Sequence, residues 1–158
     1  MRLLFVCLGN ICRSPTAEGV MRSLIVDAGL EAEIEVDSAG TGAWHVGNPP
    51  DERASATALA HGIRLQGHAR QVSREDYEFF DLLLGMDRSN VRDLRAAAPG
   101  AAERERVRLL REFDPEGTGD LDVPDPYYGG DSGFEDVFHL VHAACAGLLQ
   151  QITAGSLR

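Results

Sequence analysis

The sequence predicts an α/β fold: a single domain with a doubly wound, four-stranded parallel sheet and helices on both faces. Short apolar runs alternate with longer segments in which apolar residues recur at helical spacing, the pattern of βαβ units. The first run, Leu3–Val6, contains no polar residue, as expected of a strand covered on both sides. The chain of 158 residues has the length of one domain and shows no linker or repeat, so we expect one domain over residues 1–158.

The expected strands follow the apolar runs, at Leu3–Val6, Ile34–Val36, Phe80–Met86 and Val107–Leu110, and the second of them ends at Asp37–Gly40. A first helix is expected from Ser14, a favoured N-cap, with Pro15 at the first helical position and Gly29 at its end. Further helices are expected from residues 48–51 to Ala60 and over Ser89–Ala97.

The C-terminal stretch carries the strongest helical signal, because its apolar residues recur at i, i+3 and i+4. They are Val137, Leu140, Val141, Ala144, Cys145, Leu148, Leu149 and Ile152. We expect this helix to pack its apolar face on the sheet, with Cys145 as an ordinary core residue.

Composition and charge exclude several classes of function. The chain is 44% hydrophobic and 25% charged, as in packed globular proteins, and its net charge of −10 makes nucleic acid and anionic membranes poor partners. No apolar run is long enough for a transmembrane helix, and the N-terminal run is too short for a signal peptide. We therefore expect a cytoplasmic protein.

The three cysteines predict neither a disulfide framework nor a metal centre. An odd number does not form a set of paired bridges, and Cys7 and Cys12 lack a second Cys/His cluster with zinc-ligand spacing. We expect no metal and no cofactor.

A candidate site lies where the first strand meets the first helix. Cys7 is followed by five residues, then Arg13 and Ser14. A loop of this length can curl the backbone N–H groups of its residues around one anion, and the helix N-terminus faces the same point. The residues of the loop are Leu8, Gly9, Asn10, Ile11 and Cys12.

The residue types of the loop suit a phosphate and a thiolate. The guanidinium of Arg13 matches two phosphate oxygens, and Gly9 and Asn10 tolerate left-handed backbone at a sharp bend. The positive field that binds phosphate also stabilises a cysteine thiolate, the nucleophilic form. The alternative is a plain buried Cys7 beside a surface Arg13; the strand, the bend and the helix start occurring together favour the site.

The stretch from Val6 to Pro15, with Ala17 and Glu18 after it, resembles the signature of the low-molecular-weight protein-tyrosine phosphatases. The resemblance covers nearly the whole chain. Its further motifs are Asp37–Thr41, Gly47–Asp51, Met86–Asp87 and Asp125–Tyr128. It implies hydrolysis of phosphotyrosine and aryl phosphates, with Cys7 as nucleophile and Arg13 as phosphate clamp.

The resemblance also implies that Asp125 is the general acid that protonates the departing phenolate. The segment from Glu112 to Asp136 holds nine acidic residues and no basic one, and like-charged neighbours favour a protonated carboxyl. From the residues alone, Asp120 and Asp122 would serve as well as Asp125.

Supporting roles are implied in the same way. In the family, the residue matching Ser14 hydrogen-bonds the thiolate, the one matching Asn10 holds the loop, and the one matching Ser38 supports Asn10. Trp44, Tyr127 and Tyr128 resemble aromatic walls that grip the substrate ring, although Trp44 could equally be a core residue.

Cys12 suggests a form of regulation, and His68 marks a departure from the family pattern. Cys12 is close enough in sequence to capture an oxidised Cys7 as a reversible disulfide, a hypothesis for protection against peroxide. Relatives tend to carry a histidine one position before His68, so this chain departs from the family pattern there.

Two other functions remain as alternatives. A thioredoxin-linked arsenate reductase shares the fold and loop but needs further cysteines, of which the chain offers only Cys145. The other is a non-catalytic phosphotyrosine-binding module. The expected partners are phosphotyrosine-containing proteins, with phosphate-like oxyanions as inhibitors.

Overall fold

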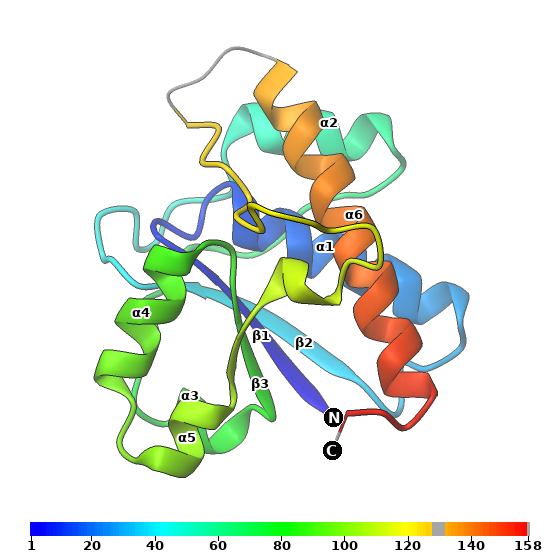
Figure 1. Cartoon of the computed structure of the whole chain (residues 1–158). Helices are drawn as coiled ribbons and strands as arrows, with labels where there is room; N and C mark the ends of the chain where they lie inside the picture. Colours follow the sequence, from blue (N-terminus) through cyan, green and yellow to red (C-terminus); the bar gives the residue numbers. More distant parts are fainter. Residues whose placement is uncertain (128–131, 158) are drawn as a thin grey trace.

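The computed structural model describes residues 1–127 and 132–157, drawn in Figure 1. Its strands are β1 (Arg2–Cys7), β2 (Glu35–Gly40), β3 (Leu82–Gly85) and β4 (Val107–Leu109). Its helices are α1 (Arg13–Asp27), α2 (Glu52–Ala60), α3 (Asp76–Phe79), α4 (Arg88–Ala97), α5 (Ala101–Glu105) and α6 (Ser132–Thr153), with a 3₁₀ turn, η1, at Leu110–Phe113.

The strands in the described part of the chain form one four-stranded, all-parallel sheet in the order β2-β1-β3-β4. In the central strand β1, Leu3 pairs with Val36 of β2 on one side and with Leu82 of β3 on the other. The chain therefore leaves β1 toward β2 and later returns to its other side as β3. The predicted doubly wound α/β class is confirmed.

Helices cover both faces of this sheet (Figure 1). One core contains Leu3 and Phe5 of β1 with apolar residues of α1 and α6. The other contains Leu4 and Val6 of β1 with residues of α4 and the segment around α3. Successive side chains of a strand point to opposite faces, so the apolar run of β1 contributes to both cores.

The order of the strands fixes where a ligand can bind. In open α/β sheets, ligands bind beyond the carboxyl ends of the strands where the winding changes direction, which here is between β1 and β3. Cys7 ends β1, and Asp87 follows β3 after one intervening residue. Both residues are thus delivered to this crevice.

Several local expectations were wrong. Helix α1 begins at Arg13 with Cys12 as its N-cap, so Ser14 is not the cap and Pro15 is not the first helical residue. Strand β2 begins at Glu35 rather than at Ile34, and it includes Asp37–Gly40, the stretch expected at its end. The short helices α3 and α5 had no counterpart in the sequence analysis. Among the described residues, no helix is both long enough and apolar enough to cross a membrane.

Candidate active site

The loop between β1 and α1 wraps around the sulfur of Cys7. Asn10 has a φ of 58°, the left-handed conformation expected at the sharp bend. Its backbone N–H donates to Cys7 Sγ at 3.3 Å, and Ser14 Oγ lies 3.0 Å from the same sulfur. The position of Ser14 in the first turn of α1 explains why its hydroxyl is unavailable for capping: it faces the cysteine.

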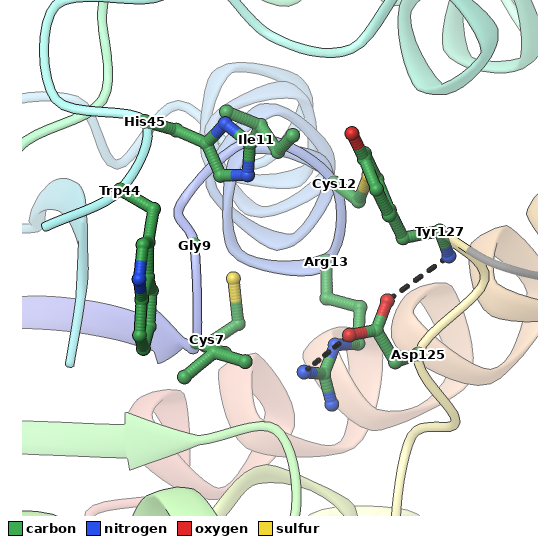
Figure 2. Close-up of a pocket in the computed structure, with 10 residues that line it drawn as sticks. Cys7, Gly9, Ile11, Cys12, Arg13, Trp44, His45, Asp125 and Tyr127 are labelled. Atoms are coloured by element: carbon green, nitrogen blue, oxygen red, sulfur yellow. Dashed lines mark hydrogen bonds and ion pairs between the residues drawn. The ribbon is translucent and has the colours of Figure 1, made fainter. Parts of the chain in front are cut away.

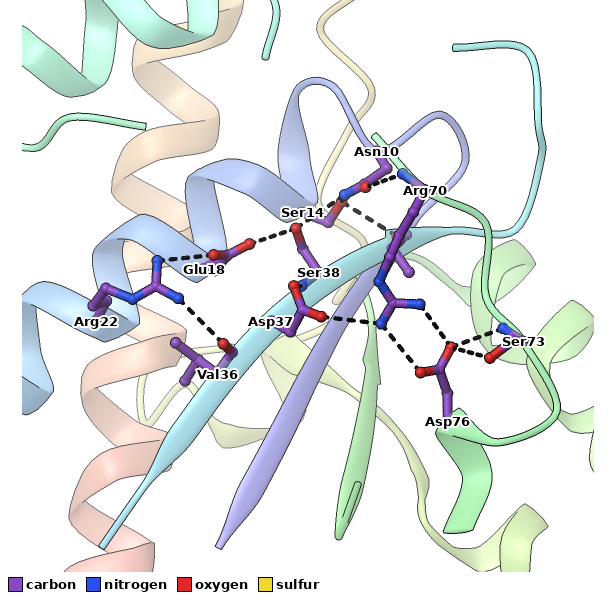
Figure 3. A network of polar contacts seen from close by, with 11 residues as sticks. Asn10, Ser14, Glu18, Arg22, Val36, Asp37, Ser38, Arg70, Ser73 and Asp76 are labelled. Atoms are coloured by element: carbon purple, nitrogen blue, oxygen red, sulfur yellow. Dashed lines mark hydrogen bonds and ion pairs between the residues drawn. The ribbon is translucent and has the colours of Figure 1, made fainter. Parts of the chain in front are cut away.

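The hydrogen bonds of Asn10 determine which way the Ser14 hydroxyl points (Figure 3). Asn10 Oδ1 accepts from the backbone N–H of Arg70 at 3.0 Å, which leaves the amide NH₂ to donate to Ser14 Oγ at 2.8 Å and Ser38 Oγ at 3.0 Å. Ser14 Oγ therefore already accepts one hydrogen bond, and its own hydrogen can reach either Cys7 Sγ at 3.0 Å or the carbonyl of Ala39 at 3.4 Å. The shorter of the two contacts places the hydroxyl where it can donate to the sulfur.

A carboxylate stands at the far end of this chain of bonds. The hydroxyl of Ser38 donates to Glu18 Oε1 at 2.6 Å, so its oxygen is left to accept from Asn10. Arg22 holds Glu18 through a 2.8 Å bond. The predicted proximity of Ser38 to Asn10 is present, and Glu18 is a member of the network to which the sequence analysis gave no role.

A second charged group supports the loop from outside. The guanidinium of Arg70 bonds Asp76 at 2.9 Å and Asp37 at 3.1 Å, which fixes the backbone N–H that binds Asn10 (Figure 3). His68 is exposed and lines a separate cavity behind the loop, together with Asn10 and Ser38.

Arg13 is held by two groups that lie far from it along the chain. Its side chain is 3% exposed, and Nη1 donates to Asp87 Oδ2 at 2.6 Å and to the carbonyl of Val123 at 3.0 Å. Asp87 Oδ1 meanwhile caps α4 by accepting from the N–H of Asn90. One carboxylate thus starts a helix and orients the arginine.

Charges near Arg13 outweigh the cost of burying it. Burial alone would lower the pKa of Arg13, but Cys7, Asp87 and Asp125 raise it overall, so the guanidinium remains a fixed cation. The sequence analysis named Asp87 only as part of a family motif and gave it no role. The signal that could have identified it is an N-cap aspartate directly after a strand that ends at the predicted crevice.

Asp125 lies at the same cavity as Cys7 and Arg13 (Figure 2). Its Oδ2 is 3.6 Å from Arg13 Nη2, and its Oδ1 accepts from the backbone N–H of Tyr127 at 3.0 Å. The side chain is 38% exposed, so the carboxyl faces both the arginine and solvent. Asp122 instead accepts from the N–H of Arg88, and neither it nor Asp120 lines this cavity.

The cavity has a volume of about 400 Å³. Figure 2 shows the sulfur of Cys7 between Trp44 on one side and Tyr127 on the other. The indole of Trp44 is 75% exposed, so the interpretation of Trp44 as a core residue was wrong. Leu8, Gly9, Ile11 and Cys12 also line the cavity, as do two residues of the walls, Trp44 and Tyr127.

His45 is a wall residue that the sequence analysis missed. Its ring lies 5.8 Å from that of Tyr127, tilted by 51°. A side chain at Gly9 would meet this ring, because an added Cβ would lie 2.9 Å from His45 Cδ2. The glycine thus allows the histidine to lie against the loop. Tyr128, the third predicted aromatic residue, lies outside the described residues.

Of the other two cysteines, Cys12 lines the cavity and Cys145 does not. Burial raises the pKa of Cys12 to about 12, with further contributions from the negative charges of Asp51, Cys7 and Asp125. Burial also raises the pKa of Cys145, whose thiol donates to the carbonyl of Ala17 at 3.8 Å in the core between α1 and α6. Cys145 is the core residue that the helical stripe predicts.

Comparison with known proteins agrees with this geometry. The sequence model of the family "low molecular weight phosphotyrosine protein phosphatase" matches residues 2–156. A low molecular weight protein-tyrosine-phosphatase of Streptomyces coelicolor is 49% identical, over 96% of this chain and 93% of that protein.

Solved structures are similar over nearly the whole chain. A protein tyrosine phosphatase from Entamoeba histolytica, with Hepes in its active site, matches with a TM-score of 0.95 and 36% identity, covering 99% of both chains. An arginine phosphatase from Drosophila matches with a TM-score of 0.87 and 31% identity, covering 96% of this chain and 98% of that one.

Proposed function

The chain belongs to the low molecular weight phosphotyrosine protein phosphatases, and from this premise we propose that it hydrolyses phosphotyrosine in proteins through a cysteinyl-phosphate intermediate. The observation that carries the proposal is that Cys7, Arg13 and Asp125 line one cavity. A nucleophile, an anion clamp and a proton donor are the groups that this reaction requires. We expect the substrates to be phosphoproteins of the cytoplasm.

In the first step the Cys7 thiolate attacks phosphorus and the bond from phosphorus to the tyrosine oxygen breaks. Asp125 transfers its proton to that oxygen, so tyrosine leaves as the neutral phenol. The product is a phosphate group joined to Cys7 Sγ, with Asp125 ionised. The 3.0 Å contact from Ser14 Oγ and the N–H of Asn10 support the thiolate before attack.

In the second step Asp125 takes a proton from a water molecule that attacks the same phosphorus. The bond between sulfur and phosphorus breaks, phosphate leaves and the thiolate returns. Throughout both steps Arg13 and the N–H groups of the loop bind the non-bridging oxygens, where negative charge is concentrated. Phosphate-like oxyanions such as vanadate would occupy the same place and inhibit.

Aromatic walls support an aryl substrate. Trp44 and Tyr127 flank the opening above Cys7 (Figure 2), and aromatic pairs gain about 0.5–1.5 kcal/mol beyond the area that they bury. The arginine phosphatase among the structural relatives makes phosphoarginine the most informative comparison substrate. We expect the aryl ester to be preferred.

The two alternative functions have less support. A resolving cysteine for an arsenate reductase would have to be Cys145, whose thiol is fully buried in the core. A non-catalytic binding module would not need a proton donor, yet Asp125 lies 3.6 Å from the clamp. Two assays distinguish the three functions: a phosphatase turns over phosphotyrosine, an arsenate reductase reduces arsenate with thioredoxin, and a binding module does neither.

The test is steady-state hydrolysis of a phosphotyrosine peptide and of p-nitrophenyl phosphate in excess EDTA, compared with phosphoserine and phosphoarginine peptides. Cys7→Ser should abolish turnover, and Asp125→Ala should lower kcat by about 10²–10⁴, the usual contribution of a general acid. Asp120→Ala is the matched control, since Asp120 belongs to the same acidic segment but does not line the cavity. Loss of activity in EDTA, or equal rates for Asp125→Ala and Asp120→Ala, would refute the proposal.

A further inference from the structure

Away from the cavity, two histidines and a glutamate converge between α2 and α6. His61 Nε2 lies 2.6 Å from Glu135 Oε1, and His139 Nε2 lies 3.0 Å from the same oxygen. Their candidate ligand atoms all lie within 4.8 Å of one another. None of the three residues lines the cavity that contains Cys7.

Local structure brings these side chains together. His61 is the C-cap residue of α2, whereas Glu135 and His139 lie four residues apart on α6 and therefore on one face of that helix. The ring of His61 stacks on Phe138, with 4.0 Å between centroids and 10° between planes. Phe138 is buried, so this stacking fixes the direction in which His61 points. Figure 1 shows α2 beside the first turns of α6.

The three donors form a ligand set that zinc uses. Two imidazole nitrogens and one carboxylate oxygen, with water in the fourth position, make a tetrahedral zinc site. At zinc–ligand distances of about 2.0–2.2 Å, tetrahedral ligand atoms lie about 3.3 Å apart. The present separations of 2.6 Å and 3.0 Å would widen by less than about 1 Å, which exposed side chains can accommodate.

We propose that His61, Glu135 and His139 form a binding site for a borderline divalent transition metal, for which Zn²⁺ is the matching ion. The metal takes the place of the hydrogens that the two Nε2 atoms share with Glu135; each bound imidazole keeps one proton, on Nδ1, and the second proton of any imidazolium is released to solvent. Magnesium and calcium prefer all-oxygen ligands and are excluded by the two imidazoles.

The position of the site gives it a structural consequence. A metal bound there joins the end of α2 to the first turns of α6. Helix α6 is also the next element in the chain after Asp125 and Tyr127. Zinc therefore fixes the helix to which the proton-donor segment leads. Because the ion binds only the folded chain, it should raise the Tm by about 5–11 °C at a hundredfold excess over Kd.

Zinc binding is measured by isothermal titration in the Cys7→Ser background, which removes the thiolate as a competing ligand. One Zn²⁺ per chain is expected, with visible absorption bands of a four-coordinate ion when Co²⁺ replaces it. His139→Asn should weaken binding at least about tenfold, since even loss of a hydrogen bond to a metal ligand costs that much. The imidazole of His139 is 64% exposed, so this substitution leaves the core intact.

The matched control is His142→Asn, a nearby exposed histidine of α6 that is not in the cluster. It should bind zinc as tightly as the background and show the same rise in Tm. Circular dichroism verifies that each variant is folded. Failure to take up zinc saturably, or equal affinities for His139→Asn and His142→Asn, would overturn the proposal and leave the cluster as a hydrogen-bonded group only.

Discussion

Replacing Asp87 by asparagine tests how the phosphate clamp is held. Asp87 uses both carboxylate oxygens: Oδ1 accepts from Asn90 N at 2.8 Å and Oδ2 from Arg13 Nη1 at 2.6 Å. Asparagine has one oxygen, so it can keep only one of these bonds. If it continues to cap α4, which asparagine does as well as aspartate, its NH₂ group faces the guanidinium of Arg13.

The magnitude follows from the burial of the pair. Removing one partner of a buried ion pair costs about 3–5 kcal/mol, and losing a hydrogen bond to a charged group costs about 1.5–3 kcal/mol. Asp87 is 21% exposed, and Arg13 keeps the Val123 carbonyl and Asp125. We therefore expect Asp87→Asn to lower the free energy of unfolding by about 2–3 kcal/mol, or the Tm by about 4–12 °C.

The activity of Asp87→Asn should also fall, because the guanidinium of Arg13 is no longer fixed at the position where it binds phosphate. A loss of about 1.4 kcal/mol in transition-state binding lowers kcat/KM tenfold. Asp87→Ala should be about 1 kcal/mol less stable than Asp87→Asn, since it also removes the helix cap.

The assay is urea unfolding followed by circular dichroism, with kcat/KM measured on the same preparations. Asp93→Asn is the matched control, because Asp93 is an exposed aspartate on the same helix α4. If Asp87→Asn stays within about 0.5 kcal/mol of the parent, the range of ordinary surface changes, and its kinetics are unchanged, Arg13 does not depend on this carboxylate.

Three further predictions concern the sulfur and the aromatic wall. Ser14→Ala removes a donor to Cys7 and should slow both turnover and alkylation of Cys7 by iodoacetate about 10–100-fold; unchanged alkylation would show that the donor is unimportant. After peroxide treatment, the rate of closing a Cys7–Cys12 disulfide should rise about tenfold per pH unit from pH 7 to 9, because the pKa of Cys12, about 12, lies above that range and each unit gives tenfold more thiolate. Mass spectrometry that finds a pH-independent rate, or only over-oxidised Cys7, argues against capture by Cys12. Trp44→Ala should raise KM for a phosphotyrosine peptide about 2–10-fold and leave stability within about 0.5 kcal/mol, and an unchanged KM contradicts its role as a wall.

The architecture could be predicted because a buried helix or strand needs apolar residues at regular positions along its whole length. A strand with neighbours on both sides and helices on both faces needs apolar side chains in both directions, and Leu3–Val6 shows that pattern without knowledge of its partners. The short helices α3 and α5 span only four and five residues, too few for a helical period to stand out.

The start of α1 shows how tertiary contacts override a local preference. Serine before proline favours an N-cap, yet Ser14 lies inside the helix because its hydroxyl contacts Asn10 and Cys7. The capping preferences of residues near a helix start do not predict this position of Ser14. Its hydroxyl binds Asn10, whose side chain is held in turn by the backbone N–H of Arg70, far along the chain.

The residues of the loop could be predicted from the sequence, but of the residues that support it only Ser38 was predicted, from the resemblance to the family. Cys7, Asn10 and Arg13 belong to one contiguous segment, so residue types and spacing carry the information. The partner Asp87 lies 74 residues from Arg13, and His45 and Glu18 reach the site through contacts that no spacing encodes. Trp44 remained ambiguous because a tryptophan fits a core and a rim equally well until exposure is known.

The bond between Arg13 and Asp87 links the two helical layers at the edge of the sheet, since α1 covers one face and α4 the other. The turn that surrounds the sulfur therefore cannot open by itself: opening would separate α1 from α4 and expose a buried cation. The N–H of Asn10, which is hydrogen-bonded to the sulfur, should therefore exchange slowly with deuterium. The reaction centre is in this sense tied to the helices on both faces of the sheet.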